Sequence, residues 1–171
     1  MSEIKFSHLH LHSQYSLLDG AIRFKPLFEK LKENNMDSVA ITDHGSMFGV
    51  VEFYDMALKE GIHPVIGCEC YVAPRSLKDK TPADKDSSHL VLLAENNQGY
   101  QNLCKLASIA QQEGFYYKPR IDHEILEKYS KGLIALSACL AGEIPQLILK
   151  NNFEEAKKRA KYYNSLFGEN N

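Results

Sequence analysis

Residues 6–20 read FSHLHLHSQYSLLDG, and three histidines stand in this stretch at alternate positions, His8, His10 and His12. Strict alternation is typical of an extended strand and places the three side chains on one face, so the pattern predicts a strand over residues 4–12. Imidazoles that turn toward a core are costly to bury unless each finds a polar partner, and a metal ion is such a partner. This stretch therefore predicts a metal site beside the first strand.

The composition is that of a globular protein. Of 171 residues, 44% are hydrophobic and 25% are charged, and this length suits one domain with its own core, which we expect to cover residues 1–171. A net charge of −2 creates no overall field that would attract nucleic acid or an anionic membrane. The apolar runs are too short for a bilayer span and the N-terminus lacks a secretion signal, so we expect a cytoplasmic protein without membrane contact.

The four cysteines do not form paired CxxC motifs. With no sign of secretion, a disulfide framework is not expected. Cys68 and Cys70 would point the same way from a strand, and both are interpreted as small buried hydrophobic residues.

Apolar strands alternate with amphipathic helices along the chain, which favours a parallel, βα-built sheet or barrel. Two polar or mixed segments interrupt the pattern. Residues 74–88 are predicted to be a mobile loop, and residues 113–122 a packed aromatic turn with a solvated basic rim, an interpretation we favour over contact with a phosphate backbone. The further strands are predicted at 38–45, 63–73, 89–94 and 132–139, and the helices around 24–31, 50–58, 100–110, 144–150 and 153–167.

Potential metal ligands recur at the strand ends, where sites form in open α/β sheets and βα barrels. Glu69 is notable because an unpaired carboxylate in an apolar strand is expensive to bury. His89 departs from the pattern because it begins its strand, which an error of a few residues in the strand boundary would explain. The candidates beyond the first strand are Asp43, His44, Glu69, His89 and Cys139.

This mixture of imidazole, carboxylate and thiol groups suits zinc, manganese or iron better than calcium or magnesium. So many donors imply two or three clustered ions, an arrangement that activates water and holds both oxygens of a phosphate ester.

Several candidates also have simpler interpretations. Asp19 could be a turn residue, and Cys139 a packed thiol. Asp43 could cap a helix, or it could be a carboxylate that orients a ligand imidazole. His63 and His123 are interpreted as ordinary hydrogen-bonded histidines.

Six segments, in order and almost end to end, resemble the PHP (polymerase and histidinol phosphatase) domains at the N-terminus of bacterial DNA polymerase III alpha subunits. They are HLHLHSQYSLLDGA (8–21), ITDHGSMFGVVEFY (41–54), PVIGCECYVAPRS (64–76), HLVLLAENNQGYQNL (89–103), GFYYKPRID (114–122) and LSACLAGEIP (136–145).

The resemblance implies an α/β fold of the PHP type, a distorted (β/α)7 barrel with a trinuclear metal site at the strand C-termini. His8 stands where relatives often carry Asp and is expected beside the ligands. The family's last motif, Asp-x-His, is absent, so we expect a barrel truncated before its last strands, without the polymerase palm. The ligands implied are His10, His12, Asp19, His44, Glu69 as the bridging carboxylate, His89, and Cys139 where many PHP proteins have a histidine.

The resemblance leaves three hypotheses for function. The domain could be a metal-dependent phosphoesterase acting as a 3′–5′ exonuclease, or a metal-stabilised docking domain without activity of its own. Its partners would be the rest of the polymerase chain, primer-template DNA bound through that chain, and a separate proofreading exonuclease subunit. A histidinol-phosphatase-like enzyme is the third hypothesis, but it should lack YSLLDGA and GFYYKPRID. Intact ligands do not separate the first two hypotheses, since both bind metal.

Overall fold

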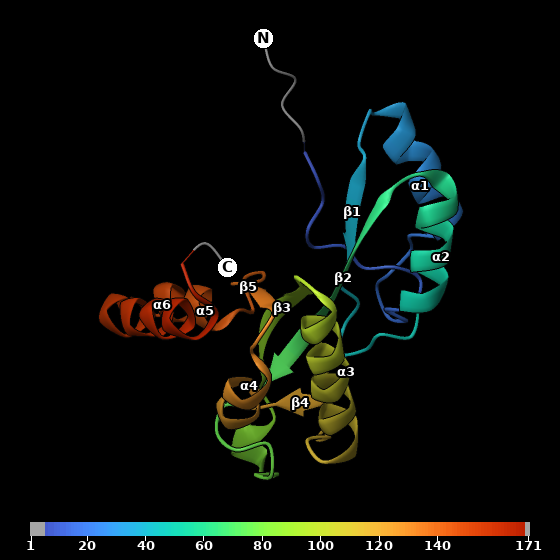
Figure 1. Ribbon diagram of the computed structural model, residues 1–171. Helices are drawn as coiled ribbons and strands as arrows, with labels where there is room; N and C mark the ends of the chain where they lie inside the picture. Colours follow the sequence, from blue (N-terminus) through green and yellow to red (C-terminus); the bar gives the residue numbers. More distant parts are fainter. Residues whose placement is uncertain (1–5, 170–171) are drawn as a thin grey trace.

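The computed structural model describes residues 6–169, in which one sheet is combined with helices (Figure 1). The elements in chain order are α1 (Phe24–Glu33), β1 (Ser38–Ile41), α2 (Val50–Glu60), β2 (His63–Val72), the 3-10 helix η1 (Pro82–Asp84), β3 (Ser88–Ala94), α3 (Asn97–Gln112), β4 (Arg120–Ile121), α4 (His123–Tyr129), β5 (Leu133–Leu136), α5 (Glu143–Leu149) and α6 (Phe153–Phe167).

β2 is the strand on which the sheet is built. β1 pairs with its first half in parallel, β4 pairs in parallel with its last residues, and β3 pairs antiparallel from Gly67 to Val72. β5 is antiparallel to β3, which gives the order β1-β2-β3-β5 with β4 beside β2. The predicted α/β class is confirmed, but the prediction of a parallel sheet holds only for the pairings of β1 and β4 with β2 and is wrong for β3 and β5. Residues 73–87 contain only the short η1, whereas a parallel return is usually made through a helix that crosses one face of the sheet.

The predicted first strand is instead an extended segment beside β1. Residues 4 and 5 of that prediction lie outside the described part of the chain. The carbonyl oxygens of His8 and Leu11 accept hydrogen bonds from Ala40 N (2.8 Å) and Thr42 N (2.9 Å). Leu11 N, however, donates to Thr42 Oγ1 (2.8 Å), a side chain. Because this bond takes the place of a backbone–backbone hydrogen bond, the β-ladder is not continuous. The segment therefore forms only an isolated bridge with β1, between His8 and Val39.

The two irregular segments are tied together by one buried arginine. Arg120 is fully buried, and its guanidinium donates to the carbonyl oxygens of Gly114 (3.1 Å), Asp84 (2.9 Å) and Leu77 (3.2 Å). The loop predicted to be mobile is thus held to the aromatic turn, and Arg120 has a structural role.

The predicted helices are all found, with ends that differ by a few residues, whereas α4 and β4 were not predicted. The start of α4 follows a recognisable signal. Asp122 precedes the helix, and its side chain accepts a hydrogen bond from Ile125 N, as an N-cap does.

Alternation along β2 separates a helix-covered face from the face that carries the charged groups. Cys68 and Cys70 are buried in the core between the sheet and α3, α4 and α6, so their prediction as buried thiols is confirmed. Glu69 lies on the opposite face, and so does Tyr71.

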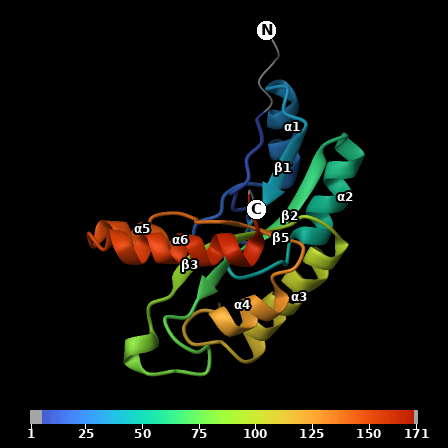
Figure 2. The same ribbon diagram turned by 60° about the vertical axis from the view of Figure 1, so that its left-hand side comes forward.

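Figures 1 and 2 show α1 and α2 beside β1 and the beginning of β2, with α5 and α6 on the side of β3 and β5. Within residues 6–169, no helix has the length and apolar character needed to cross a bilayer.

Candidate metal centre

Glu69, in the second half of β2, is surrounded by four imidazoles although its side chain is only 1% exposed. Its Oε2 lies 2.5 Å from Nε2 of His10 and 3.6 Å from Nε2 of His12. Its Oε1 lies 2.7 Å from Nδ1 of His44 and 2.6 Å from Nδ1 of His89. Each carboxylate oxygen therefore faces its own pair of imidazoles.

His44 reaches Glu69 because pairing with β2 continues beyond the end of β1. Glu69 N donates to Asp43 O (3.1 Å), and Gly45 N donates to Glu69 O (2.9 Å). These two bonds fix the backbone on either side of His44 directly against the strand that carries the carboxylate.

His89 reaches the same cluster because β3 runs antiparallel to β2. β3 begins at Ser88, close to the predicted boundary, and His89 pairs with Tyr71 near the end of β2. An antiparallel strand brings its first residues to the edge where its neighbour ends. The explanation by a misplaced boundary is therefore wrong, and strand direction accounts for the position of His89.

The donor set fits metal ions. Two groups have ligand atoms that all lie within 4.8 Å of one another, His10–His12–Glu69 and His44–Glu69–His89. Glu69 Oε1 and His44 Nδ1 are buried and have no hydrogen-bond partner among the described residues, although the two atoms lie 2.7 Å apart. Buried lone pairs that converge without hydrogen-bond geometry are what a cation would satisfy, and nitrogen with carboxylate oxygen suits zinc, manganese or iron.

The Glu69 carboxylate stays ionised. Burial alone raises the pKa of Glu69, but contacts with the four imidazoles outweigh it and hold that pKa well below its usual range. The pKa of His44 is raised, chiefly by its contact with Glu69 and further by Asp19, against the effect of burial. A carboxylate that stays ionised is the state that a metal ion requires.

Three other predicted residues lie at the edge of the cluster or outside it. Asp19 Oδ2 lies 3.0 Å from Nε2 of His44, and the Asp19 side chain is 59% exposed. Cys139 Sγ lies 3.6 Å from Nδ1 of His89. The His8 ring packs edge-on against a neighbouring phenylalanine and belongs to neither ligand group.

Asp43 is buried and organises the loop between two of the predicted ligands. Its carboxylate accepts hydrogen bonds from Ser13 N (2.6 Å), Ser13 Oγ (2.8 Å) and Ser16 Oγ (2.8 Å). These bonds hold the chain between His12 and Asp19. Asp43 thus acts on the site through this loop. The sequence analysis did not single out either serine, and only their place between the two ligands could have drawn attention to them.

Tyr71 is a residue of the site that the sequence analysis missed. Its ring contacts His89 edge-on (5.1 Å between centroids) and stacks on His44 (6.1 Å). Lys118 Nζ lies 4.9 Å from the centroid of the Tyr71 ring. The period of two along β2 was the available signal, since Tyr71 follows Glu69 by two residues.

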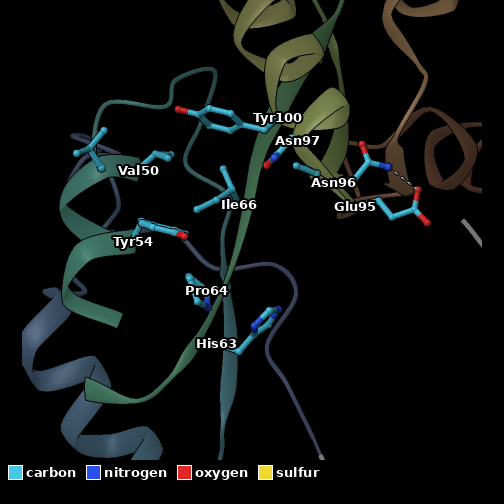
Figure 3. A pocket seen from close by; sticks show the side chains of 11 residues that line it. Val50, Tyr54, His63, Pro64, Ile66, Glu95, Asn96, Asn97 and Tyr100 are labelled. Atoms are coloured by element: carbon cyan, nitrogen blue, oxygen red, sulfur yellow. Dashed lines mark hydrogen bonds between the residues drawn. The ribbon is translucent and has the colours of Figure 1, made fainter. Parts of the chain in front are cut away.

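A separate hollow of about 390 Å³ lies near the start of β2 (Figure 3). His63 and Glu95 line it, and the hydrogen bond drawn there joins Glu95 to Asn96 (3.5 Å). Among residues 6–169, neither ligand group includes His63 or His123.

The mixed sheet and the shared carboxylate define an α/β domain with a candidate site for clustered metal ions. The PHP domain model matches residues 8–171, and the chain belongs to the PHP domain family. The predicted resemblance is confirmed.

Several curated relatives are DNA polymerase III alpha subunits, and their similarity covers nearly all of this chain. The proteins of Borreliella burgdorferi, Treponema pallidum and Thermus aquaticus are 53%, 46% and 49% identical over 96%, 100% and 98% of it. The chain covers only 14%, 15% and 14% of their lengths.

Two solved structures are more distant. One is a protein of Bifidobacterium adolescentis that is assigned as a metal-dependent phosphoesterase. It is 18% identical with a TM-score of 0.45, and the match covers 64% of this chain and 34% of the other chain. The other, an amidohydrolase from Chromobacterium violaceum, has a TM-score of 0.42 and 20% identity over 90% and 50%.

Proposed function

We propose that the domain binds divalent metal ions at the cluster around Glu69 and hydrolyses phosphodiester bonds there. The observation that carries this proposal is the division of the carboxylate, with Oε2 facing His10 and His12 while Oε1 faces His44 and His89. A carboxylate in this position can bridge two ions. Paired ions would polarise a phosphate oxygen and lower the pKa of a bound water molecule.

The protein's own contribution is to fix the ligands and their protons. When the ring proton of His44 is on Nε2, this N–H donates a hydrogen bond to Asp19 Oδ2. Nδ1 then keeps a free lone pair directed toward the cluster. Tyr71, 5% exposed, packs against the His44 and His89 rings and holds them on one side.

We extend the proposal to the substrate and partners because the close relatives are alpha subunits of DNA polymerase III. The substrate would be the 3′ end of a DNA primer, cleaved as a 3′–5′ exonuclease in the cytoplasm. The partners would be the rest of a polymerase chain, primer-template DNA and a separate proofreading exonuclease subunit. Asp19 and Cys139 would serve as further ligands, and up to three zinc, manganese or iron ions would be bound.

The experiment compares Glu69→Gln with the wild-type protein, with Glu95→Gln as the matched control at the other end of the sheet. Metal content is measured by elemental analysis, and hydrolysis is measured on bis(p-nitrophenyl) phosphate and on a 3′-labelled primer. We expect Glu69→Gln to lose metal and at least about 100-fold of the hydrolysis rate, since it removes the shared ligand. Equal rates in all three proteins would overturn the proposal.

A second candidate function is a metal-stabilised docking domain. Glu69 joins segments far apart in the sequence, around residues 10–12, 44 and 89, so bound ions would cross-link the fold. This candidate predicts that a chelator lowers the melting temperature while no hydrolysis is detected with any metal. A melting temperature unaffected by metal would exclude it.

A further inference from the structure

A hollow of about 730 Å³ opens directly beside the metal cluster. His89 and Tyr71 line it where it meets the cluster, and its other lining residues come from the loop between β2 and β3, from residues 117–118 and from the α5 region. The site described above and this hollow therefore share one wall, although the other lining residues take no part in the ligand groups.

The lining of this hollow carries more positive than negative charge. Lys85, Lys118 and Lys150 line it, together with the carboxylates of Asp86 and Glu143. The Glu143 carboxylate is already engaged, because it accepts a hydrogen bond from a tyrosine hydroxyl (2.6 Å) and pairs with an arginine (3.3 Å). The hollow is thus locally basic on a chain whose net charge is −2.

Lys118 lies at the inner end of the hollow. Its Nζ is 3.4 Å from the Tyr71 hydroxyl and 4.9 Å from the centroid of the Tyr71 ring. The same ring contacts His89, a predicted metal ligand, at 5.1 Å between centroids. Only one side chain therefore separates this ammonium group from the cluster, which suits a contact with a phosphate next to the one being hydrolysed.

Tyr117 also lines the hollow. The residue is 65% exposed, and its φ of +58° lies in the left-handed region, which a bulky side chain seldom adopts. The turn is closed by a hydrogen bond from Tyr116 N to Lys118 O (3.0 Å), and Lys85 Nζ lies 5.5 Å from the centroid of the Tyr117 ring. An aromatic ring held toward solvent beside two lysines is the combination that binds single-stranded nucleic acid.

We propose that this hollow binds a single nucleic-acid strand and guides it to the metal cluster. The three lysines would contact successive phosphates, and Tyr117 would stack on a base. Lysines from three separate segments around one hollow fit a chain of phosphates better than a single phosphate group. This inference rests on the proposed function in one respect. Only if the cluster hydrolyses phosphodiesters does the end of the strand that lies next to Lys118 and His89 become the end that is cleaved.

Binding is tested by fluorescence anisotropy with a labelled oligothymidylate, in a chelator so that hydrolysis and metal play no part. Lys118→Gln and Lys85→Gln should each weaken binding and reduce the slope of log K against log salt by about 0.7, the value for one lost phosphate contact on a single strand. Lys59→Gln is the matched control. It lies in the last turn of α2, before β2 begins at His63, and His63 itself is roughly 26 Å from Tyr71 along the strand at ~3.3 Å per residue, so the variant should change neither quantity.

Stacking is tested separately with a strand of the same length that lacks bases. Tyr117→Ala should bind oligothymidylate about tenfold more weakly and the abasic strand as the wild-type protein does, while Tyr117→Phe should restore the affinity. An equal loss on both strands would mean that Tyr117 does not stack and would overturn this part of the inference.

These results separate the inference from the proposed function. If the wild-type protein hydrolyses neither bis(p-nitrophenyl) phosphate nor primer ends, but the lysine and tyrosine variants show the expected losses, the proposed function fails and the binding groove stands. If the lysine variants bind the oligonucleotide with wild-type affinity and salt slope, the groove is refuted, whatever the cluster hydrolyses.

Discussion

Oε1 of Glu69 lies 2.6 Å from Nδ1 of His89, although one residue stands well inside β2 and the other near the start of β3. The antiparallel register places Tyr71 opposite His89, so His89 and Glu69 are diagonal neighbours on one face of the sheet. This arrangement adds the imidazole of a third segment to a carboxylate that His10 and His44 already contact.

The two proposed metal positions should be separable by mutation. His10→Ala removes a ligand only from the group on Oε2, and His89→Ala removes one only from the group on Oε1. Each variant should lose about one ion per chain in elemental analysis and the double variant both, since each group supplies its own nitrogen ligands. His63→Ala, outside both groups, is the control. Loss of all metal in one single variant and none in the other would contradict two separate positions.

Asp43→Asn should destabilise the fold and weaken the metal site together. The amide would present a donor to Ser13 N or to one of the two serine hydroxyls that now donate to the carboxylate. We expect a loss of about 2–3 kcal/mol in the free energy of unfolding, measured with urea, because a buried charge-assisted network is broken. Asp55→Asn on the exposed side of α2 should cost less than about 0.5 kcal/mol. Similar values for the two variants would rule out the role given to Asp43.

Residues of the site could be predicted where their positions follow from a local sequence pattern, and not where they depend on how distant segments pair. Alternation alone brought His10 and His12 to one face, and both lie within 3.6 Å of Glu69. His44 follows a strand end, which is a local property. The position of His89 was identified but wrongly explained, because strand direction depends on how residues 73–87 cross the sheet and not on any local period.

Other features left weak signals. β4 has only two residues, too few for a periodic pattern, and its pairing with β2 is a tertiary contact. α4 has a capping aspartate, but it follows directly on the irregular aromatic segment. Asp43 was expected as a cap or an imidazole partner, whereas its actual partners, Ser13 and Ser16, are about 30 residues away in sequence and could be found only from the fold.

Gly45→Ala should be more harmful than Gly61→Ala. Both glycines have positive φ, +57° and +70°, so alanine at either position carries the left-handed strain of about 1–2 kcal/mol. A Cβ on Gly45 would also lie 2.7 Å from Pro119 Cγ and 2.9 Å from the Tyr71 ring, while one on Gly61 meets nothing within 4 Å. Thermal unfolding should show a loss larger by at least about 1 kcal/mol for Gly45→Ala. Equal losses would show that the packing beside His44 is not tight.

Glu143→Gln should abolish part of the protein's acid sensitivity. Burial raises the pKa of Glu143, but its contacts with His123, Tyr163 and Arg159 outweigh this and lower the pKa below the ordinary 4.5. A lowered folded-state pKa stabilises the fold above the unfolded value, and this stabilisation is lost as the pH falls through the folded-state value. Glu143→Gln should lower the free energy of unfolding by about 1–2 kcal/mol at neutral pH. The loss is limited to this size because the side chain is 23% exposed and solvent screens its contacts in part.

Urea titrations of the wild-type protein and Glu143→Gln over a range of pH measure this effect. The difference in free energy of unfolding should be constant at neutral pH and shrink as the pH falls below about 4.5. A difference that persists unchanged in acid would mean that the carboxylate charge does not hold α5 against α4 and α6.

The measurement that addresses the central claim most directly is electron paramagnetic resonance of the protein loaded with Mn²⁺, used as a probe for the two metal positions. If Glu69 bridges them, the wild-type protein should show a spin-coupled manganese pair, and Glu69→Gln should show only isolated Mn²⁺ signals of reduced intensity, while Glu95→Gln keeps the coupled spectrum. A wild-type spectrum of isolated ions, or an unchanged coupled spectrum in Glu69→Gln, would contradict a shared carboxylate at the centre of this site.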